Sequence, residues 1–281
     1  RSIPGYVGGN SFWVNDGEIS NRGIDLSVTA RIIQNDRFQW SSTLNGTYLK
    51  NRVERLSGGK DDFINGSSPA AGMVDYATII KPGEAIGTFW GYEWTGLDEK
   101  GHDTYRDVDG NQLIDGGDRK VIGKANPDFT LGWNNSLSYK NWDLSMQFTS
   151  QLGFKILNEP RAYYENNSHA YNRLKSVEEA PYGGQYTLSS SQPQTMVSYY
   201  LENGNFLKLT NLTIGYNFPF KNNKYIKNVR AYLSGDNLFC ITGYSGLDPE
   251  LSNPYPTYAG IDNRDKYPSI RSFTFGLNLT F

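Results

Sequence analysis

The sequence contains few of the residues on which disulfide-bonded or metal-dependent catalytic domains rely. Its 281 residues include one cysteine and two histidines, so Cys240 has no partner for an internal disulfide bond. The formal net charge of −2 and the pI near 5.8 give no reason to expect a nucleic-acid partner. Long apolar runs are also missing, which excludes transmembrane helices but not a barrel whose strands alternate apolar and polar side chains.

Catalytic motifs are missing as well. The chain has no Gly-x-Ser-x-Gly or His-Glu-x-x-His motif and no glycine-rich phosphate loop. Glu159, Glu165 and Glu178 could supply a pair of glycosidase carboxylates, but charged residues in a long exterior loop are usually only solvated. We therefore expect that the chain is not an enzyme.

Aromatic residues and glycine are abundant. The chain has 20 Tyr, 14 Phe, 6 Trp and 30 Gly, a composition typical of β-rich proteins. Alternation of apolar and polar side chains predicts strands at 22–33, 37–49, 72–80, 85–95, 127–139, 141–152, 204–217, 228–239 and 269–281, of which 72–80 and 85–95 are the weakest. Most exceed the roughly 5 to 6 residues usual in soluble sheets and approach the about 9 to 11 that a tilted strand needs to cross a bilayer.

The connections between these strands alternate in length. The short ones lie at 34–36, 81–84, 140–141 and 218–227, and the long ones at 50–71, 96–126, 153–204 and 240–268. Soluble domains seldom contain loops longer than about 12 to 15 residues, whereas short turns on one side and long loops on the other are typical of outer-membrane barrels. We therefore predict an all-β fold. Residues 1–21 would be an outer loop leading into the barrel, and residues 22–281 a transmembrane up-and-down β-barrel segment with four long extracellular loops.

One face of these strands should meet lipid. The side chains expected to point outward include Ile24, Leu26, Val28, Phe273, Phe275, Leu277 and Leu279. Aromatic residues near the short turns would lie at a membrane interface, and Phe281, which ends the last alternating strand, is expected to act as an assembly signal. A β-sandwich whose core is filled by the same rings is the alternative interpretation.

About nine strands are too few, and odd in number, for a bacterial barrel. Single-chain barrels of this kind have an even number of strands, and an open sheet edge is not tolerated in lipid. We therefore expect further strands upstream in a longer protein. Residues 1–9 also lack the basic and apolar segments of a secretion signal, which would then lie upstream too.

Several segments resemble one protein family in their order and spacing. They are 17–26, 107–115 with Asp118, Arg119, Ile122 and Gly123 after it, 206–216, 235–239, 244–250 and 273–281. Each segment is weakly specific alone, whereas their order and spacing together are highly specific. On these residues nearly the whole chain resembles the C-terminal barrel portion of the SusC/RagA-like TonB-dependent outer-membrane transporters.

The resemblance implies a complete barrel of about 22 strands with a plugged lumen. It implies an N-terminal plug, a TonB box through which the TonB complex supplies energy, and a SusD-like surface lipoprotein as partner. The implied location is the outer membrane of a Gram-negative, Bacteroidota-type bacterium, and the implied cargo is oligosaccharide or peptide. The plug and the remaining N-terminal barrel strands would be separate from this chain, which would not transport alone.

An acidic segment in the 96–126 loop has the spacing of a calcium-binding loop. Its oxygen ligands would come from Asp107, Asp109, Asn111, the Leu113 carbonyl, Asp115 and Asp118, at positions that an EF-hand loop uses. Against this, Gln112 stands where the sharp turn prefers glycine, and Asp118 replaces a bidentate glutamate. Two interpretations remain, a structural Ca²⁺ that braces the loop and a solvated acidic turn. No other cofactor is expected.

Tyrosines are concentrated in the last two long loops. The candidates for substrate contact are Tyr163, Tyr164, Tyr171, Tyr255 and Tyr258. Flat rings suit sugars and peptides alike, but such rings also pack loops against one another or against a partner protein, and packing is the commoner role.

Three functional classes follow from these observations. The first is the C-terminal barrel segment of a TonB-dependent nutrient importer. The alternatives are a secreted, calcium-braced β-sandwich module that binds carbohydrate and a barrel-embedded surface hydrolase.

Overall fold

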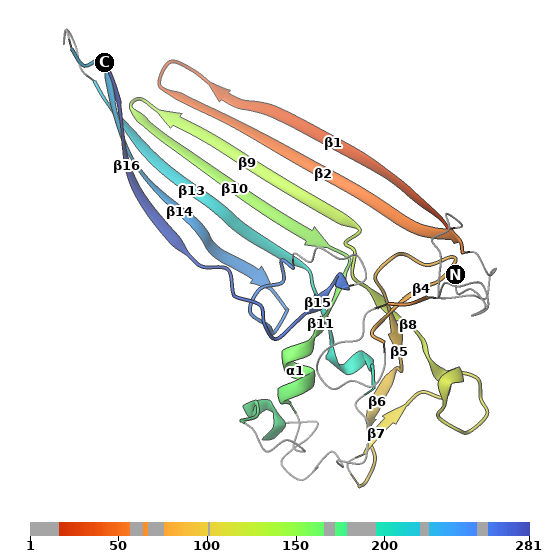
Figure 1. Cartoon of the computed structure of the whole chain (residues 1–281). Helices are drawn as coiled ribbons and strands as arrows, with labels where there is room; N and C mark the ends of the chain where they lie inside the picture. The colour runs from red at the N-terminus through yellow and green to blue at the C-terminus, as the bar shows by residue number, and fades with distance from the viewer. Residues whose placement is uncertain are drawn as a thin grey trace, which may run out of the picture.

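Seven strands form the largest sheet of the chain, and each runs antiparallel to its neighbours (Figure 1). The computed structural model describes residues 17–56, 64–66, 76–100, 102–165, 172–178, 195–219, 225–251 and 258–281. The strands are β1 (Glu18–Gln34), β2 (Phe38–Arg55), β9 (Phe129–Tyr139), β10 (Trp142–Leu152), β13 (Phe206–Phe218), β14 (Asn228–Thr242) and β16 (Ser272–Thr280). They lie in the sheet in the order in which they occur in the chain, which confirms the predicted all-β fold class.

The connections leave the sheet at its two ends with very different lengths. Residues 35–37, 140–141 and 219–227 join strands at one end, and 56–128, 153–205 and 243–271 join them at the other (Figure 1). The turn at 81–84 lies at the second end and not, as predicted, at the first. Its Gly83 N–H donates to the Val53 carbonyl (2.8 Å), and the Val53 N–H donates to the Glu84 carbonyl (2.8 Å).

Two predicted strands are not part of this sheet, so the predicted count of nine is wrong for the described residues. Within 72–80 the structure has β4 (Thr78–Ile80), with 72–75 outside the described ranges, and 85–95 is divided between β5 (Thr88–Gly91) and β6 (Trp94–Leu97). Neighbouring residues of β4 and β5 are buried together instead of alternating with exposed ones. Strands buried on both faces pack in a core and have no face to present to lipid.

The long connections fold into structure of their own at one end of the large sheet. One small sheet contains β3 (Ile64–Asn65), β4, β5 and β8 (Lys120–Lys124), and a second contains β11 (Lys155–Asn158), β12 (Leu201–Asn203) and β15 (Ile261–Asp262). The remaining elements are β6 with β7 (Asp103–Tyr105), the helix α1 (Glu159–Tyr164), and the 3₁₀ turns η2 (Gly116–Asp118), η3 (Lys175–Glu178) and η4 (Ser198–Tyr200). No helix in the described ranges is long and apolar enough to cross a membrane.

The main apolar core lies in these connections rather than on a face of the large sheet. Phe89, Leu157 and Met196 are fully buried in one cluster. A second cluster joins Phe154, Ile156, Phe206 and Tyr244, and Phe206 is the first residue of β13. Full burial stabilises such a side chain by about 1.5 to 3 kcal/mol, so these clusters hold the connections in a defined shape.

The large sheet has one apolar and one polar face. Its exposed apolar side chains include all of those expected to point outward, namely Ile24, Leu26, Val28, Phe273, Phe275, Leu277 and Leu279. The opposite face carries polar cross-strand pairs, such as Ser27 with Asn45 (2.7 Å) and Thr29 with Thr43 (3.0 Å). Many exposed apolar side chains on one face of a sheet indicate a contact surface.

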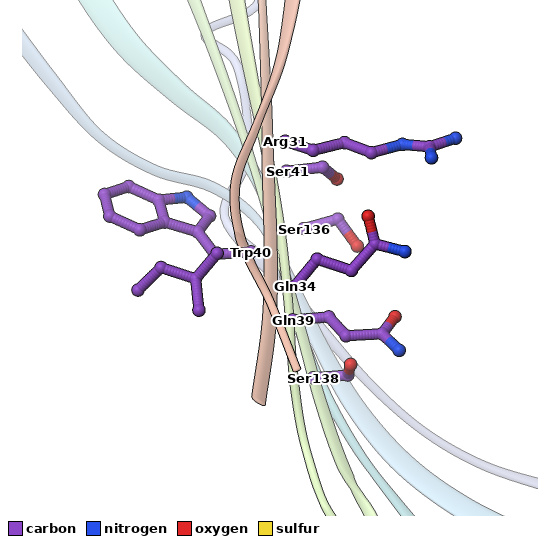
Figure 2. A pocket seen from close by; sticks show the side chains of 8 residues that line it. Arg31, Gln34, Gln39, Trp40, Ser41, Ser136 and Ser138 are labelled. Atoms are coloured by element: carbon purple, nitrogen blue, oxygen red, sulfur yellow. The ribbon is translucent and has the colours of Figure 1, made fainter. Parts of the chain in front are cut away.

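A β-bulge near the β1–β2 turn decides which side chains take the apolar face there. Arg31 pairs with Ser41 and Ile33 pairs with Trp40, so Ile32 is the extra residue. Figure 2 shows Trp40 on one side of the sheet and the polar side chains of Arg31 and Ser41 on the other, where they border a hollow of about 280 Å³.

Two tryptophans provide hydrogen-bond partners for polar residues on the apolar face. The Trp40 indole donates to Asn135 Oδ1 (3.2 Å), and the Trp133 indole donates to the Ser42 hydroxyl (2.8 Å). Both bonds join β2 to β9 and add side-chain contacts to the backbone pairing of these strands.

Phe281 directly follows β16, and its side chain is 72% exposed. Its role as an assembly signal stays a prediction.

Replacing Leu26 by arginine tests whether the apolar face meets lipid. Leu26 lies at the middle of β1, where a cation facing hydrocarbon is expected to cost about 2 to 4 kcal/mol of folding free energy. The neighbouring Ser27→Arg on the polar face is the matched control and should cost much less. Heat-modifiable gel mobility of the full-length protein would measure the folded fraction, and equal losses in both variants would contradict lipid contact.

Candidate functional site

The long connections enclose a cavity of about 650 Å³, here called the loop cavity. One wall is formed by α1 and its flanking residues. A second wall comes from the last long connection, through 245–247, Asp262, Asn263, Arg264 and Lys266. Its size lies within the roughly 300 to 1,000 Å³ usual for ligand pockets.

The helix α1 is specified locally by its first residues. The Asn158 side chain caps the helix by accepting a hydrogen bond from the Arg161 N–H (2.9 Å), and Pro160 lies at the start, where a missing N–H is tolerated. Arg161, Tyr164 and Glu165, all on or directly after this helix, line the loop cavity.

A buried charged network forms part of this wall. Glu165 is 1% exposed and accepts hydrogen bonds from the Arg161 guanidinium and from the Tyr199 hydroxyl (2.6 Å). Arg161 also reaches Glu202 (3.2 Å) and lies 4.5 Å from the centre of the Tyr199 ring. Because these groups neutralise one another, Glu165 is held as a structural ion-pair partner and is not placed as a free catalytic base.

Glu202 connects α1 to the last long connection. Its carboxylate accepts from the Ser245 N–H (2.8 Å), the Ser245 hydroxyl (2.7 Å) and the Asn158 amide (3.0 Å). Burial favours the neutral acid, but these donors and Arg161 hold the pKa of Glu202 below its usual value. Glu202 therefore stays ionised and links the two walls.

Arg264 carries a second cation at the edge of the loop cavity. Its guanidinium lies 4.1 Å from the centre of the Tyr163 ring and 3.4 Å from Glu159 Oε1. Burial raises the pKa of Glu159, and the neighbouring Arg264 opposes that rise. Two of the carboxylates considered for a glycosidase pair, Glu159 and Glu165, are thus each paired with an arginine.

Asp262 and Lys266 complete the charged lining. The Tyr244 hydroxyl donates to Asp262 (2.6 Å), and burial raises the pKa of that carboxyl. The Lys266 ammonium donates to the backbone carbonyls of Asp248 (3.1 Å) and Glu250 (3.2 Å). The cavity thus presents charges of both signs, hydroxyls and an aromatic ring, a combination that suits a polar ligand held by hydrogen bonds.

The tyrosines predicted to contact substrate lie in different places among the described residues. Tyr164 lines the loop cavity, whereas Tyr163 contacts Arg264. Tyr258 is 42% exposed and is not among the residues that line the cavity. Tyr171 and Tyr255 lie outside the described residues.

The charged lining was not predicted as a site from the sequence. Asn158 and Pro160 are local signals of a helix start, and the i,i+4 spacing of Arg161 and Glu165 indicates a helical ion pair. No local signal pairs these residues with Glu202, which is about 40 residues further along the same connection, or with Ser245, which lies in the next long connection.

The acidic loop, residues 107–118, brings three of its predicted ligands together. One carboxylate oxygen each of Asp107, Asp109 and Asp118 lies within 4.8 Å of the other two. Asp115 instead caps η2 by accepting from the Gly117 N–H (2.7 Å). The other two predicted ligand residues are exposed, and the Asn111 side chain accepts from the Leu113 N–H (2.7 Å).

The backbone of the acidic loop makes the sharp turn despite its glutamine. Gln112 has φ of 66°, the left-handed conformation for which glycine is preferred. Asp107 stabilises the turn by accepting from the N–H groups of Gly110 (2.6 Å) and Gln112 (2.9 Å). The N–H groups of Asp115 and Val108 hold the pKa of Asp118 below its usual value. The loop thus has its shape from its own hydrogen bonds, which both interpretations allow.

Comparisons with known proteins agree with this architecture. TonB-dependent receptor P3 of Formosa agariphila is 35% identical over 309 residues, an alignment that covers 100% of this chain and 30% of the receptor. TonB-dependent receptor SusC of Bacteroides thetaiotaomicron is 30% identical over 284 residues, covering 95% of this chain and 27% of SusC. A solved structure of the RagAB peptide transporter matches with a TM-score of 0.79 at 25% identity, covering 100% of this chain and 31% of the other. No protein-family model matches the sequence.

The antiparallel sheet and these similarities define the class as the barrel portion of a TonB-dependent receptor. Within that class, the chain belongs to the SusC/RagA-like family, as its sequence motifs predicted. It spans about 30% of the length of the curated relatives that it matches.

Changing Asp262 tests whether its charge or its hydrogen bond matters for stability. Asp262→Asn keeps an acceptor for Tyr244 and should be tolerated at neutral pH, whereas Asp262→Ala strands a buried hydroxyl and should cost about 1 to 3 kcal/mol. Burial raises the folded pKa of Asp262 above its unfolded value, so the folded state keeps a proton that the unfolded state has already lost. The contribution of this carboxyl to stability should therefore fall as the pH rises from the unfolded to the folded pKa, and the Asn variant should lack this fall. Denaturation of the full-length protein followed by near-ultraviolet circular dichroism would measure both effects. Equal losses of stability in Asp262→Asn and Asp262→Ala would contradict a stabilising role for the hydrogen bond from Tyr244.

Proposed function

We propose that this chain supplies part of the barrel wall and outer loops of a TonB-dependent outer-membrane importer. The observation that carries the proposal is the loop cavity, whose lining includes charged and aromatic side chains and which is built by the long connections at one end of a sheet whose apolar face is exposed. A cavity at that end would meet nutrients before they enter the lumen. The family supports TonB as energy source, and SusC and RagAB support a SusD-like surface lipoprotein as partner.

Oligosaccharides are the proposed cargo. Tyr164 offers an aromatic face, and Ser245, Asn158 and the neighbouring carboxylates offer the donors and acceptors that sugar hydroxyls need. Calcium, if bound by the acidic loop, would brace the connection that also contains β6, β7 and β8.

Peptides are the second candidate, and the charges of the loop cavity favour them. Arg264 and Lys266 could meet a peptide carboxylate, and Asp262 an amino group, whereas neutral sugars have neither. The RagAB relative, described as a peptide transporter, is consistent with this alternative.

Ligand identity and uptake test the proposed function together. Mass spectrometry of small molecules released from the purified full-length protein should detect oligosaccharides or peptides, and cells should take up fluorescently labelled malto-oligosaccharides or a tryptic digest of casein. Tyr164→Ala should raise the half-saturation concentration by about twofold to tenfold, since a lost aromatic contact is worth about 0.5 to 1.5 kcal/mol. Tyr225→Ala, at the short-turn end, is the control. Unchanged uptake in Tyr164→Ala would argue against the loop cavity as the contact site.

Calcium at the acidic loop has its own test. Added Ca²⁺ should slow backbone hydrogen exchange of residues 107–118 in the full-length protein, because ion ligation would restrain the turn. Asp109→Asn should abolish this effect, whereas Glu99→Gln in the preceding turn should preserve it. Identical exchange with and without Ca²⁺ would favour the solvated acidic turn.

A further inference from the structure

Lys208 is a buried cation on a strand of the large sheet. It lies near the start of β13, at the end of the sheet from which the long connections leave, and only 4% of it is exposed. A lysine ammonium is rarely buried to this degree unless it is paired.

The partners of Lys208 come from both halves of the connection 243–271. Its ammonium lies 3.2 Å from Asp248 Oδ2 and 2.9 Å from Glu250 Oε2, residues that follow β14. It also lies 3.4 Å from the hydroxyl of Ser269, which precedes β16, and Ser269 in turn donates to Asp248. Lys208, on a strand of the large sheet, thus contacts two segments of the connection that are about 20 residues apart in sequence.

Further contacts make this attachment rigid. Lys266 donates to the backbone carbonyls of Asp248 and Glu250, and the Glu250 N–H donates to Asp248 Oδ1 (2.9 Å). Phe206, two residues before Lys208 on the same strand, packs with Tyr244 in an apolar cluster on which Leu251 also packs. Exclusion of water by this cluster strengthens the ion pairs.

The attached connection forms one wall of the loop cavity. Gly246 lies against the Tyr244 ring with no room for a side chain, so the 245–247 turn takes its position from Tyr244. Arg264 and Lys266 line the cavity from the other half of the connection. Movement of the connection away from β13 would therefore displace both groups of lining residues at once.

We propose that Lys208 is a positioning residue for substrate capture, which fastens the 243–271 connection to the barrel wall and so sets the shape of the loop cavity. The proposal rests on the proposed function, because it assumes that the cavity contacts the imported molecule. Lys208 itself does not line the cavity, so its effect would be indirect. Small displacements of positioning groups have large effects on ligand contacts.

The central test compares Lys208→Met with Lys208→Arg in the full-length protein. The methionine has similar length but leaves Asp248 buried beside Glu250 without their cation, whereas arginine restores the charge. Hydrogen exchange of peptides within 244–251 and 264–271 should become faster in Lys208→Met and return toward wild type in Lys208→Arg. Lys50→Met, an exposed lysine at the same end of the sheet on β2, is the matched control and should change nothing.

Uptake provides a readout that a purely stabilising role would not give. With labelled malto-oligosaccharides and the casein digest as probes, Lys208→Met should raise the half-saturation concentration of the imported probe by about tenfold, as expected for loss of one well-placed contact. The maximal rate per folded molecule should stay within about twofold, since binding and not translocation would be impaired. Lys208→Arg should recover most of the affinity.

Separate outcomes overturn the proposal and the function on which it rests. Unchanged exchange and unchanged half-saturation in Lys208→Met would overturn the positioning role, as would a fall in maximal rate alone. If Lys208→Met does not fold, Glu250→Gln, whose side chain is partly exposed, must show the same direction of both effects, or the proposal fails. If wild-type protein imports neither probe and releases no ligand, the proposed function fails, while the exchange data still decide whether Lys208 holds the connection.

Discussion

Hydrogen bonding between the backbones of neighbouring strands is the constraint on which the rest of this structure depends. A strand surrounded by lipid has no water for its N–H and C=O groups, so it must be paired along its length. From β1 to β16 each strand of the large sheet pairs with the next in an antiparallel ladder. Side chains must then alternate between an apolar and a polar face, and little room for a specific site remains on the apolar one. Specific binding sites are therefore expected in the connections.

The long strands could be predicted because their alternation is a property of the local sequence. Residues 141–152, for example, alternate almost without interruption and form β10. Alternation alone misplaces the segments 72–80 and 85–95. Ala77 and Phe89 are buried in the core around Met196, and β5 pairs with β8, contacts that no local window contains. The turn at Lys81 to Glu84 was recognised correctly as a turn, but its place depends on Val53, which lies far away in the chain.

The two candidate sites also differ in whether their residues are close together in the sequence. The acidic loop could be predicted from the sequence because its carboxylates are close together in the chain. The structure brings Asp107, Asp109 and Asp118 together. Gln112 shows the limit of a motif rule, because side-chain bonds from Asp107 hold a conformation that the rule reserves for glycine. The loop cavity could not be predicted as a whole, since Arg161 and Glu202 are far apart within the connection 153–205 and meet Ser245 only after the connection 243–271 has packed against it.

Separate apolar clusters hold the connections, while backbone ladders hold the wall. Phe89, Leu157 and Met196 pack without any residue of the seven-stranded sheet in their cluster, and only Phe206 brings that sheet into the other one. A substitution among the cluster residues would therefore reshape the cavity while the strand register is preserved. Such a division allows the connections to change in sequence while the strand ladder is kept, because diversification is confined to the part of the molecule that the sheet does not constrain.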